Sequence, residues 1–119
     1  VITKFLDRIK QNESPLIFGN GSQIRDFIYV GDVVMANLLS MMSDVSNLLV
    51  NIGTGKAITI LELANMVVEV SGLELKPIFQ DPLQGDIEKS HADISLAIES
   101  FKWKPKKDLK EWLSETLKK

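Results

Sequence analysis

A glycine turn at Gly19 and Gly21, followed by an apolar stretch with a single arginine, limits the structures that this chain can form. Gly19 and Gly21 permit backbone angles closed to other residues, and most residues from there to Val30 favour strands. Arg25 lies within the stretch, and Asp26 would point to the opposite face of a strand because side chains alternate. A guanidinium in such a segment needs a carboxylate, carbonyl oxygens or a phosphate as its partner. The residues alone leave two alternatives open, an internal acid or an anionic ligand.

Composition narrows the class of protein. The 119 residues are 45% hydrophobic and 25% charged, which predicts one globular domain over residues 1–119. Without cysteine the chain forms no disulfide or thiolate metal site, and with a single histidine, His91, we predict no metal site and a cytoplasmic location.

Neither a membrane nor a nucleic acid is an expected partner. No apolar run approaches the roughly 20 residues that span a bilayer. The lysines that follow Phe101 are interspersed with acidic residues and lack a regular array of aromatic side chains. We therefore interpret them as a solvated face.

Hydrophobic periodicity predicts helices over 1–10, 33–42, 60–71, 94–98 and 109–117. Their predicted N-caps are Asp32, Thr59 in a capping box with Glu62, Asp93, and Asp108 with Glu111. The first helix has no capping residue before it, which suggests a fragment of a longer protein. The second is apolar nearly all round, so it should need more covering surface than this chain provides.

Strands are predicted at 16–18, along the central stretch 24–30, at 47–52 as a buried strand, and at 76–79. The turn-rich loop 81–86 carries two acids and is of the kind that binds ligands, whereas 101–105 is predicted to be an extended link. Alternating short strands and amphipathic helices indicate an α/β fold.

Several motifs fail when tested individually. Gly19-x-Gly21 and Gly53-x-Gly55 have isoleucine where a dinucleotide-binding fingerprint needs its third glycine, and we interpret Gly53-Thr54-Gly55 as a turn. His91 lacks a nucleophile in a known pattern, so a surface or core position is expected. Tyr29 has no lysine four residues on, so core packing is the prediction.

Four short motifs nevertheless occur in a fixed order: Phe18-Gly19-Asn20-Gly21-Ser22-Gln23-x-Arg25-Asp26-Phe27-Ile28-Tyr29-Val30-x-Asp32, Asn51-Ile52-Gly53-Thr54-Gly55, Gly85-Asp86 with Ala92-Asp93-Ile94-Ser95, and Trp103-x-Pro105. Each is weak alone. The ordered set resembles the C-terminal part of NAD-dependent sugar-nucleotide epimerases and dehydratases, which form the extended short-chain dehydrogenase/reductase family. Within this family it resembles UDP-hexose 4-epimerases most, such as those that act on UDP-glucose.

This resemblance implies an α/β substrate-binding lobe, inactive without an N-terminal Rossmann half. That half would bind NAD and supply the catalytic Tyr-x-x-x-Lys pair, so no catalytic and no cofactor-binding residue is expected in this chain. The implied ligand is a UDP-sugar, and the implied parent enzyme is a homodimer.

The resemblance also assigns roles to five residues. They are Phe18 near the nucleotide base, Arg25 on the diphosphate, Phe27 as an aromatic close to the nucleotide, Ile60 against the base or ribose, and Asp86 on a ribose hydroxyl. A planar guanidinium suits a diphosphate, and a carboxylate suits a diol.

One departure concerns Leu83, which stands where many members carry a second arginine, with Gln84 and Lys89 as nearby polar substitutes. Ser90 stands where some epimerases have a tyrosine. A dehydratase or decarboxylase of the same family, and a non-catalytic binding module, therefore remain alternatives to an epimerase.

Overall fold

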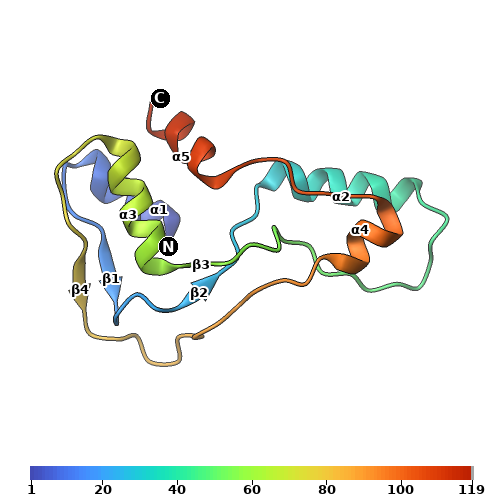
Figure 1. Cartoon of the computed structure of the whole chain (residues 1–119), viewed down its shortest axis with the longest axis horizontal. Helices are drawn as coiled ribbons and strands as arrows, with labels where there is room; N and C mark the ends of the chain where they lie inside the picture. Colours follow the sequence, from blue (N-terminus) through green and yellow to red (C-terminus); the bar gives the residue numbers. More distant parts are fainter. Residues whose placement is uncertain (119) are drawn as a thin grey trace.

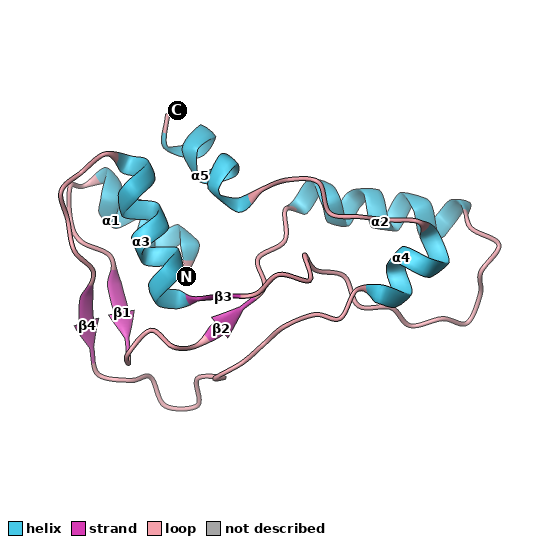
Figure 2. Ribbon diagram, in the orientation of Figure 1, coloured by secondary structure: helices cyan, strands magenta, loops and turns pink. Residues whose placement is uncertain are grey.

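The computed structural model describes residues 1–118, a mixed α/β structure of five helices and four short strands. The elements are α1 (Ile2–Lys10), β1 (Leu16–Phe18), β2 (Ile24–Arg25), α2 (Val30–Met42), β3 (Ile58–Thr59), α3 (Ile60–Ser71), β4 (Ile78–Gln80), α4 (Ser95–Phe101) and α5 (Leu109–Leu117). Figures 1 and 2 show α1, α3 and α5 with β1 and β4 at one end, and α2 with α4 at the other.

The molecule is long and thin for its mass. Its extents are 50 × 34 × 16 Å and its Cα radius of gyration is 16.5 Å, whereas a compact chain of this length has about 13.5 Å. It exposes 8124 Å², and a compact monomer of this mass exposes about 6,450 Å². The surplus of about 1,700 Å² means that an unusually large share of the side chains meets solvent.

Helix α3 organises the larger core. Its capping box is confirmed: the Thr59 hydroxyl accepts from Glu62 N at 3.0 Å, and the Glu62 carboxylate accepts from Thr59 N at 2.9 Å. The helix ends as predicted at Gly72, whose φ of 73° favours glycine. Its buried face packs with α1, β1 and α5 in one cluster of Phe5, Leu6, Ile9, Ile17, Ile60, Leu63, Ala64, Val67 and Leu113.

Two small sheets flank this core. β1 pairs in parallel with β4, where Ile17 lies opposite Phe79, so the last strand is shifted slightly from the predicted 76–79. β2 pairs antiparallel with β3, where Arg25 lies opposite Ile58. The sheets thereby hold β1 and β2 on either side of the turn at Gly19 and Gly21, both of which have positive φ.

The predicted central strand over 24–30 is wrong beyond Arg25, and so is the N-cap at Asp32. Helix α2 begins at Val30 with Tyr29 as its N-cap. Asp32 lies in the first turn, and its carboxylate accepts from the backbone N–H groups of Lys106 and Lys107 at 3.1 and 3.0 Å. The Asp32 carboxylate therefore binds backbone groups more than 70 positions away instead of capping the first turn of its own helix.

The predicted buried strand over 47–52 is also wrong. The segment is irregular, and Leu49 is 91% exposed. A strand needs a neighbouring backbone to pair with, and none of the described strands reaches this segment. Leu48 and Leu49 therefore lie on the surface, whereas Val50 and Ile52 are partly buried against the smaller core described below.

A second, smaller core joins α2 to α4 through Ala36, Ala97 and Trp103. Trp103, predicted in an extended link, is buried and donates from its indole Nε1 to the Asp32 carbonyl oxygen at 2.9 Å. Helix α4 begins at Ser95 rather than directly after Asp93, whose carboxylate accepts from Ser95 N at 3.0 Å. The bonds from Ser95 lower the pKa of Asp93 below its ordinary value.

The outer face of α2 is apolar and exposed, in agreement with the expectation that this chain lacks the surface to cover it. The exposed side chains are Val30, Val34, Met35, Leu38, Met41 and Met42. At the other end of the chain α5 has its predicted N-cap, since Asp108 accepts from Glu111 N at 3.0 Å. Among residues 1–118, no helix is long and apolar enough to cross a membrane.

Candidate functional site

The five predicted ligand-binding residues line one pocket of about 360 Å³, which we call the Arg25 pocket. β1 and β2 supply Phe18 and Arg25, and the segment after β2 supplies Phe27. The start of α3 supplies Ile60, and the loop after β4 supplies Asp86. The full lining is Val1, Leu16, Phe18, Gln23, Arg25, Phe27, Ile60, Leu83 and Asp86. The fold thus gathers the set, and the binding role of each residue stays a prediction.

Arg25 and Asp86 form an ion pair within this pocket. The distance from Arg25 Nη2 to Asp86 Oδ1 is 2.8 Å, and the two side chains are 23% and 32% exposed. Arg25 Nη1 also donates to the Ile24 carbonyl oxygen at 2.8 Å. A guanidinium has five N–H donors, so about three remain for a ligand. The structure therefore shows an internal acid as a partner of Arg25 and leaves donors for an anion as well.

Gln23 is a lining residue that the sequence did not single out. Its Nε2 donates to the Phe18 carbonyl oxygen at 2.7 Å and to Asp86 Oδ2 at 2.9 Å. Asp86 thus accepts one bond on each oxygen, and roughly two of its four lone-pair positions stay open. Only the long-range contact reveals this role, so the sequence alone gave no signal for it.

Leu83 lies in the lining and is 56% exposed, whereas neither Gln84 nor Lys89 belongs to the lining. Among the lining residues, all of which the structure describes, Arg25 is the only cationic side chain. The pocket therefore offers one guanidinium, one carboxylate, the Gln23 amide and several apolar side chains.

Asp26 occupies the turn at Gly53-Thr54-Gly55. Its carboxylate accepts from Thr54 N at 2.9 Å, from Gly55 N at 3.1 Å and from the Thr54 hydroxyl. The chain bends at Gly53 and Gly55, in agreement with the predicted turn, and the N–H groups of Thr54 and Gly55 are already paired with an anion of the chain itself. His91 lies on the surface and donates through Nε2 to the Gly55 carbonyl oxygen at 2.9 Å.

These contacts test whether the chain itself suits a dinucleotide cofactor. The N–H groups of Thr54 and Gly55 in this turn are not available to a pyrophosphate, because the Asp26 carboxylate accepts from both. A carboxylate at that place would also repel a phosphate. The described residues therefore do not fit NAD at this turn.

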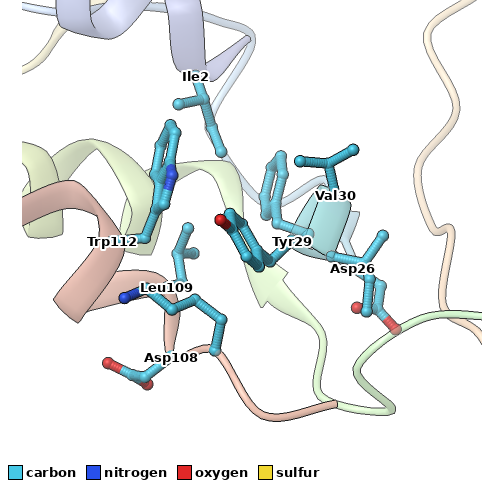
Figure 3. A pocket seen from close by; sticks show the side chains of 10 residues that line it. Ile2, Asp26, Tyr29, Val30, Asp108, Leu109 and Trp112 are labelled. Atoms are coloured by element: carbon cyan, nitrogen blue, oxygen red, sulfur yellow. The ribbon is translucent and has the colours of Figure 1, made fainter. Parts of the chain in front are cut away.

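A second pocket, of about 370 Å³, lies between the start of α2 and α5. Figure 3 shows Ile2, Tyr29 and Trp112 facing a common space, with Asp26 on the far side from Trp112. Tyr29 is 40% exposed, so its predicted core position is wrong.

Lys107 is the cation of this second pocket, and its ammonium lies 2.8 Å from Glu115 Oε2. That hydrogen bond raises the pKa of Lys107 above its ordinary value. Lys107 pairs with a second carboxylate as well, that of Glu111 at 3.7 Å, and the lining also includes Asp26 and Asp108. With more acidic than basic side chains, this pocket suits an anionic ligand less well than the Arg25 pocket. Among residues 1–118, no group of three or more His, Cys, Asp or Glu side chains is placed to hold a metal ion.

Comparison with known proteins yields one consistent family. Residues 1–53 match the NAD dependent epimerase/dehydratase family. A putative UDP-glucose 4-epimerase of Methanocaldococcus jannaschii is 44% identical over 111 residues, which are 93% of this chain and 35% of that protein.

Two solved structures superimpose closely. The UDP-glucose 4-epimerase of Thermotoga maritima with UDP-glucose has a TM-score of 0.91 at 38% identity, over 98% of this chain and 38% of that one. A UDP-N-acetylglucosamine 4-epimerase of Methanobrevibacter ruminantium, in complex with UDP-N-acetylmuramic acid, has a TM-score of 0.90 at 41% identity, over 99% and 38%. The chain thus spans little more than a third of the length of these relatives. The chain belongs to the NAD-dependent epimerase/dehydratase family and corresponds to a part of the full-length proteins of that family.

Proposed function

We propose that residues 1–119 form the UDP-sugar-binding C-terminal domain of a cytoplasmic, NAD-dependent nucleotide-sugar 4-epimerase. The substrate is UDP-glucose and UDP-galactose, or the N-acetyl analogue. The cofactor and the proton-transfer pair belong to a Rossmann half outside these residues, and the complete enzyme is a homodimer. By itself this chain interconverts no sugar nucleotides.

The observation that carries the proposal is the chemistry of the Arg25 pocket. A nucleoside diphosphate has an aromatic base, a diol and a diphosphate, and the pocket offers a counterpart to each. Phe18, Phe27 and Ile60 present apolar surface for the base, Asp86 has open lone pairs for ribose hydroxyls, and Arg25 has unused N–H groups for the diphosphate.

Similarity favours an epimerase over the other reactions of the family. The Methanocaldococcus jannaschii relative at 44% identity is a putative UDP-glucose 4-epimerase, and the Thermotoga maritima structure at 38% identity is a UDP-glucose 4-epimerase with UDP-glucose. A dehydratase or decarboxylase remains the alternative enzyme, because the family model covers dehydratases as well. A non-catalytic binding module is the alternative from another class.

Titration by ¹⁵N NMR tests the proposed ligand directly. UDP-glucose should shift the amide signals of Phe18, Arg25, Phe27, Ile60 and Asp86, and uridine, which lacks the diphosphate, should bind far more weakly. The absence of shifts, or shifts confined to the pocket of Tyr29 and Trp112, would refute the assignment. Turnover of UDP-glucose by a preparation free of host epimerase would refute the proposed lack of activity.

A further inference from the structure

Gln23 connects Asp86 of the Arg25 pocket to the backbone of Phe18 at the end of β1. Its Nε2 has two hydrogens, and both are used, one on the Phe18 carbonyl oxygen and one on Asp86 Oδ2. The bond to Asp86 joins residues 63 positions apart in the sequence. Gln23 therefore links the turn after β1 to the loop after β4.

The other end of the same amide is unsatisfied. Gln23 Oε1 is buried and has no hydrogen-bond partner among the described residues. Turning the amide over would not relieve it, because the oxygen would then face two acceptors, the Phe18 carbonyl and the Asp86 carboxylate. A buried unpaired carbonyl costs free energy, so the two donated bonds must hold the side chain in this orientation.

This arrangement fixes the Asp86 carboxylate from two sides. Arg25 binds Oδ1 at 2.8 Å and Gln23 binds Oδ2 at 2.9 Å, so rotation about the bond to the carboxyl group would break both contacts. The backbone of the loop that carries Asp86 is held separately, because Ile24 N donates to the Glu88 carbonyl oxygen at 2.8 Å and Ser90 N donates to the Ile24 carbonyl oxygen at 2.9 Å. What Arg25 and Gln23 fix is therefore the orientation of the carboxylate. Without Gln23 the carboxylate would be held by Arg25 alone, the same group that a diphosphate would engage.

We propose that Gln23 is a positioning residue that makes the pocket selective for a ribose diol. When the Arg25 guanidinium binds the diphosphate, Gln23 keeps the Asp86 carboxylate in its orientation. The open lone pairs of the carboxylate then accept hydrogen bonds from the two ribose hydroxyls. This inference rests on the proposed binding of a UDP-sugar. The preference for ribose over a sugar without these hydroxyls then depends on the Gln23 amide, although this amide does not itself bind the hydroxyls.

The test compares two ligands that differ only in those hydroxyls. Dissociation constants for UDP and 2′,3′-dideoxy-UDP are measured by NMR titration on the 119-residue chain and on its Gln23→Met variant, which keeps the volume and removes both bonds. The matched control is Asn20→Ala, which removes a bond to Ser22 N of 2.9 Å in the same turn without touching Asp86.

The unaltered chain should prefer UDP over the dideoxy analogue by about tenfold, as expected for a hydrogen bond to a charged acceptor. Gln23→Met should reduce that preference to about threefold or less, mainly by weakening UDP, whereas Asn20→Ala should leave it unchanged. A merely structural role would weaken both ligands by the same factor, and that result overturns the inference while the proposed function stands. Equal binding of the two ligands to the unaltered chain also overturns it. If the unaltered chain binds neither ligand, the proposed function falls together with the inference.

Discussion

Replacing Arg25 by alanine should weaken the binding of UDP-sugars far more than it lowers stability. The ion pair with Asp86 is only half-buried, with side chains 23% and 32% exposed, and Asp86 keeps its bond from Gln23 when the guanidinium is gone. The lost pair should therefore cost about 1 kcal/mol of unfolding free energy, close to the value for exposed pairs. That corresponds to a decrease of about 4 °C in the melting temperature.

The effect on binding should be larger because no other cationic side chain lines the pocket. Charged hydrogen bonds to a diphosphate are worth about 1.5–3 kcal/mol, so affinity for UDP should fall roughly 10- to 150-fold. Arg25→Lys should restore only part of this, since an ammonium cannot form the bidentate contact.

Calorimetric titration of UDP, alongside thermal melts without ligand, separates the two quantities. Arg8→Ala is the matched control, because Arg8 of α1 pairs with Glu13, beyond the end of that helix, at 3.1 Å and lies outside the lining of the Arg25 pocket. It should lower the melting temperature by a similar small amount and leave UDP affinity unchanged. A collapsed melting temperature with unaltered affinity in the folded Arg25→Ala protein would refute the reasoning, because it would show that the arginine serves the fold alone.

Three further predictions concern stability and association. Leu38→Lys combined with Met41→Lys should reduce self-association in sedimentation experiments, because both side chains are exposed on the apolar face of α2; a chain that is already monomeric at high concentration would contradict this. Trp103→Phe should cost about 1–3 kcal/mol in denaturant titrations, since it removes the buried bond to the Asp32 carbonyl oxygen and part of the small core, and an unchanged midpoint would disprove that role. Thr59→Ala should cost about 1 kcal/mol through loss of the α3 cap, whereas Thr59→Ser, which keeps the acceptor, should cost much less.

Local signals predicted the larger core well. The apolar periodicity and the caps at Thr59 and Gly72 define α3, because the partners of a cap lie within one turn of the chain. The cap at Asp108 was equally predictable. These elements needed no knowledge of the rest of the molecule.

Predictions that depended on distant partners were less successful. The segment 47–52 has the composition of a strand, yet none of the described strands pairs with it. Asp32 looks like a helix cap, but its carboxylate accepts from the backbone of Lys106 and Lys107 instead.

The site shows the same division. The resemblance to a family named its five residues as a set, and the fold brings them to one pocket. Neither the ion pair between Arg25 and Asp86 nor the bridging role of Gln23 could be read from the sequence, because each contact joins residues more than 60 positions apart.

The parallel pairing of β1 with β4 has a consequence for the order in which the molecule folds. Leu16 lies opposite Ile78, so this sheet forms only after a loop of about 60 residues has closed, at an entropic cost of roughly 3–4 kcal/mol. Helix α3 and its cap involve neighbours in sequence and should form much earlier. Asp86 follows β4 and bonds to Arg25 across 61 positions, so this contact also requires the closure of a long loop. During refolding, the ability to bind a nucleotide should therefore be among the last properties to return, well after most of the helical signal.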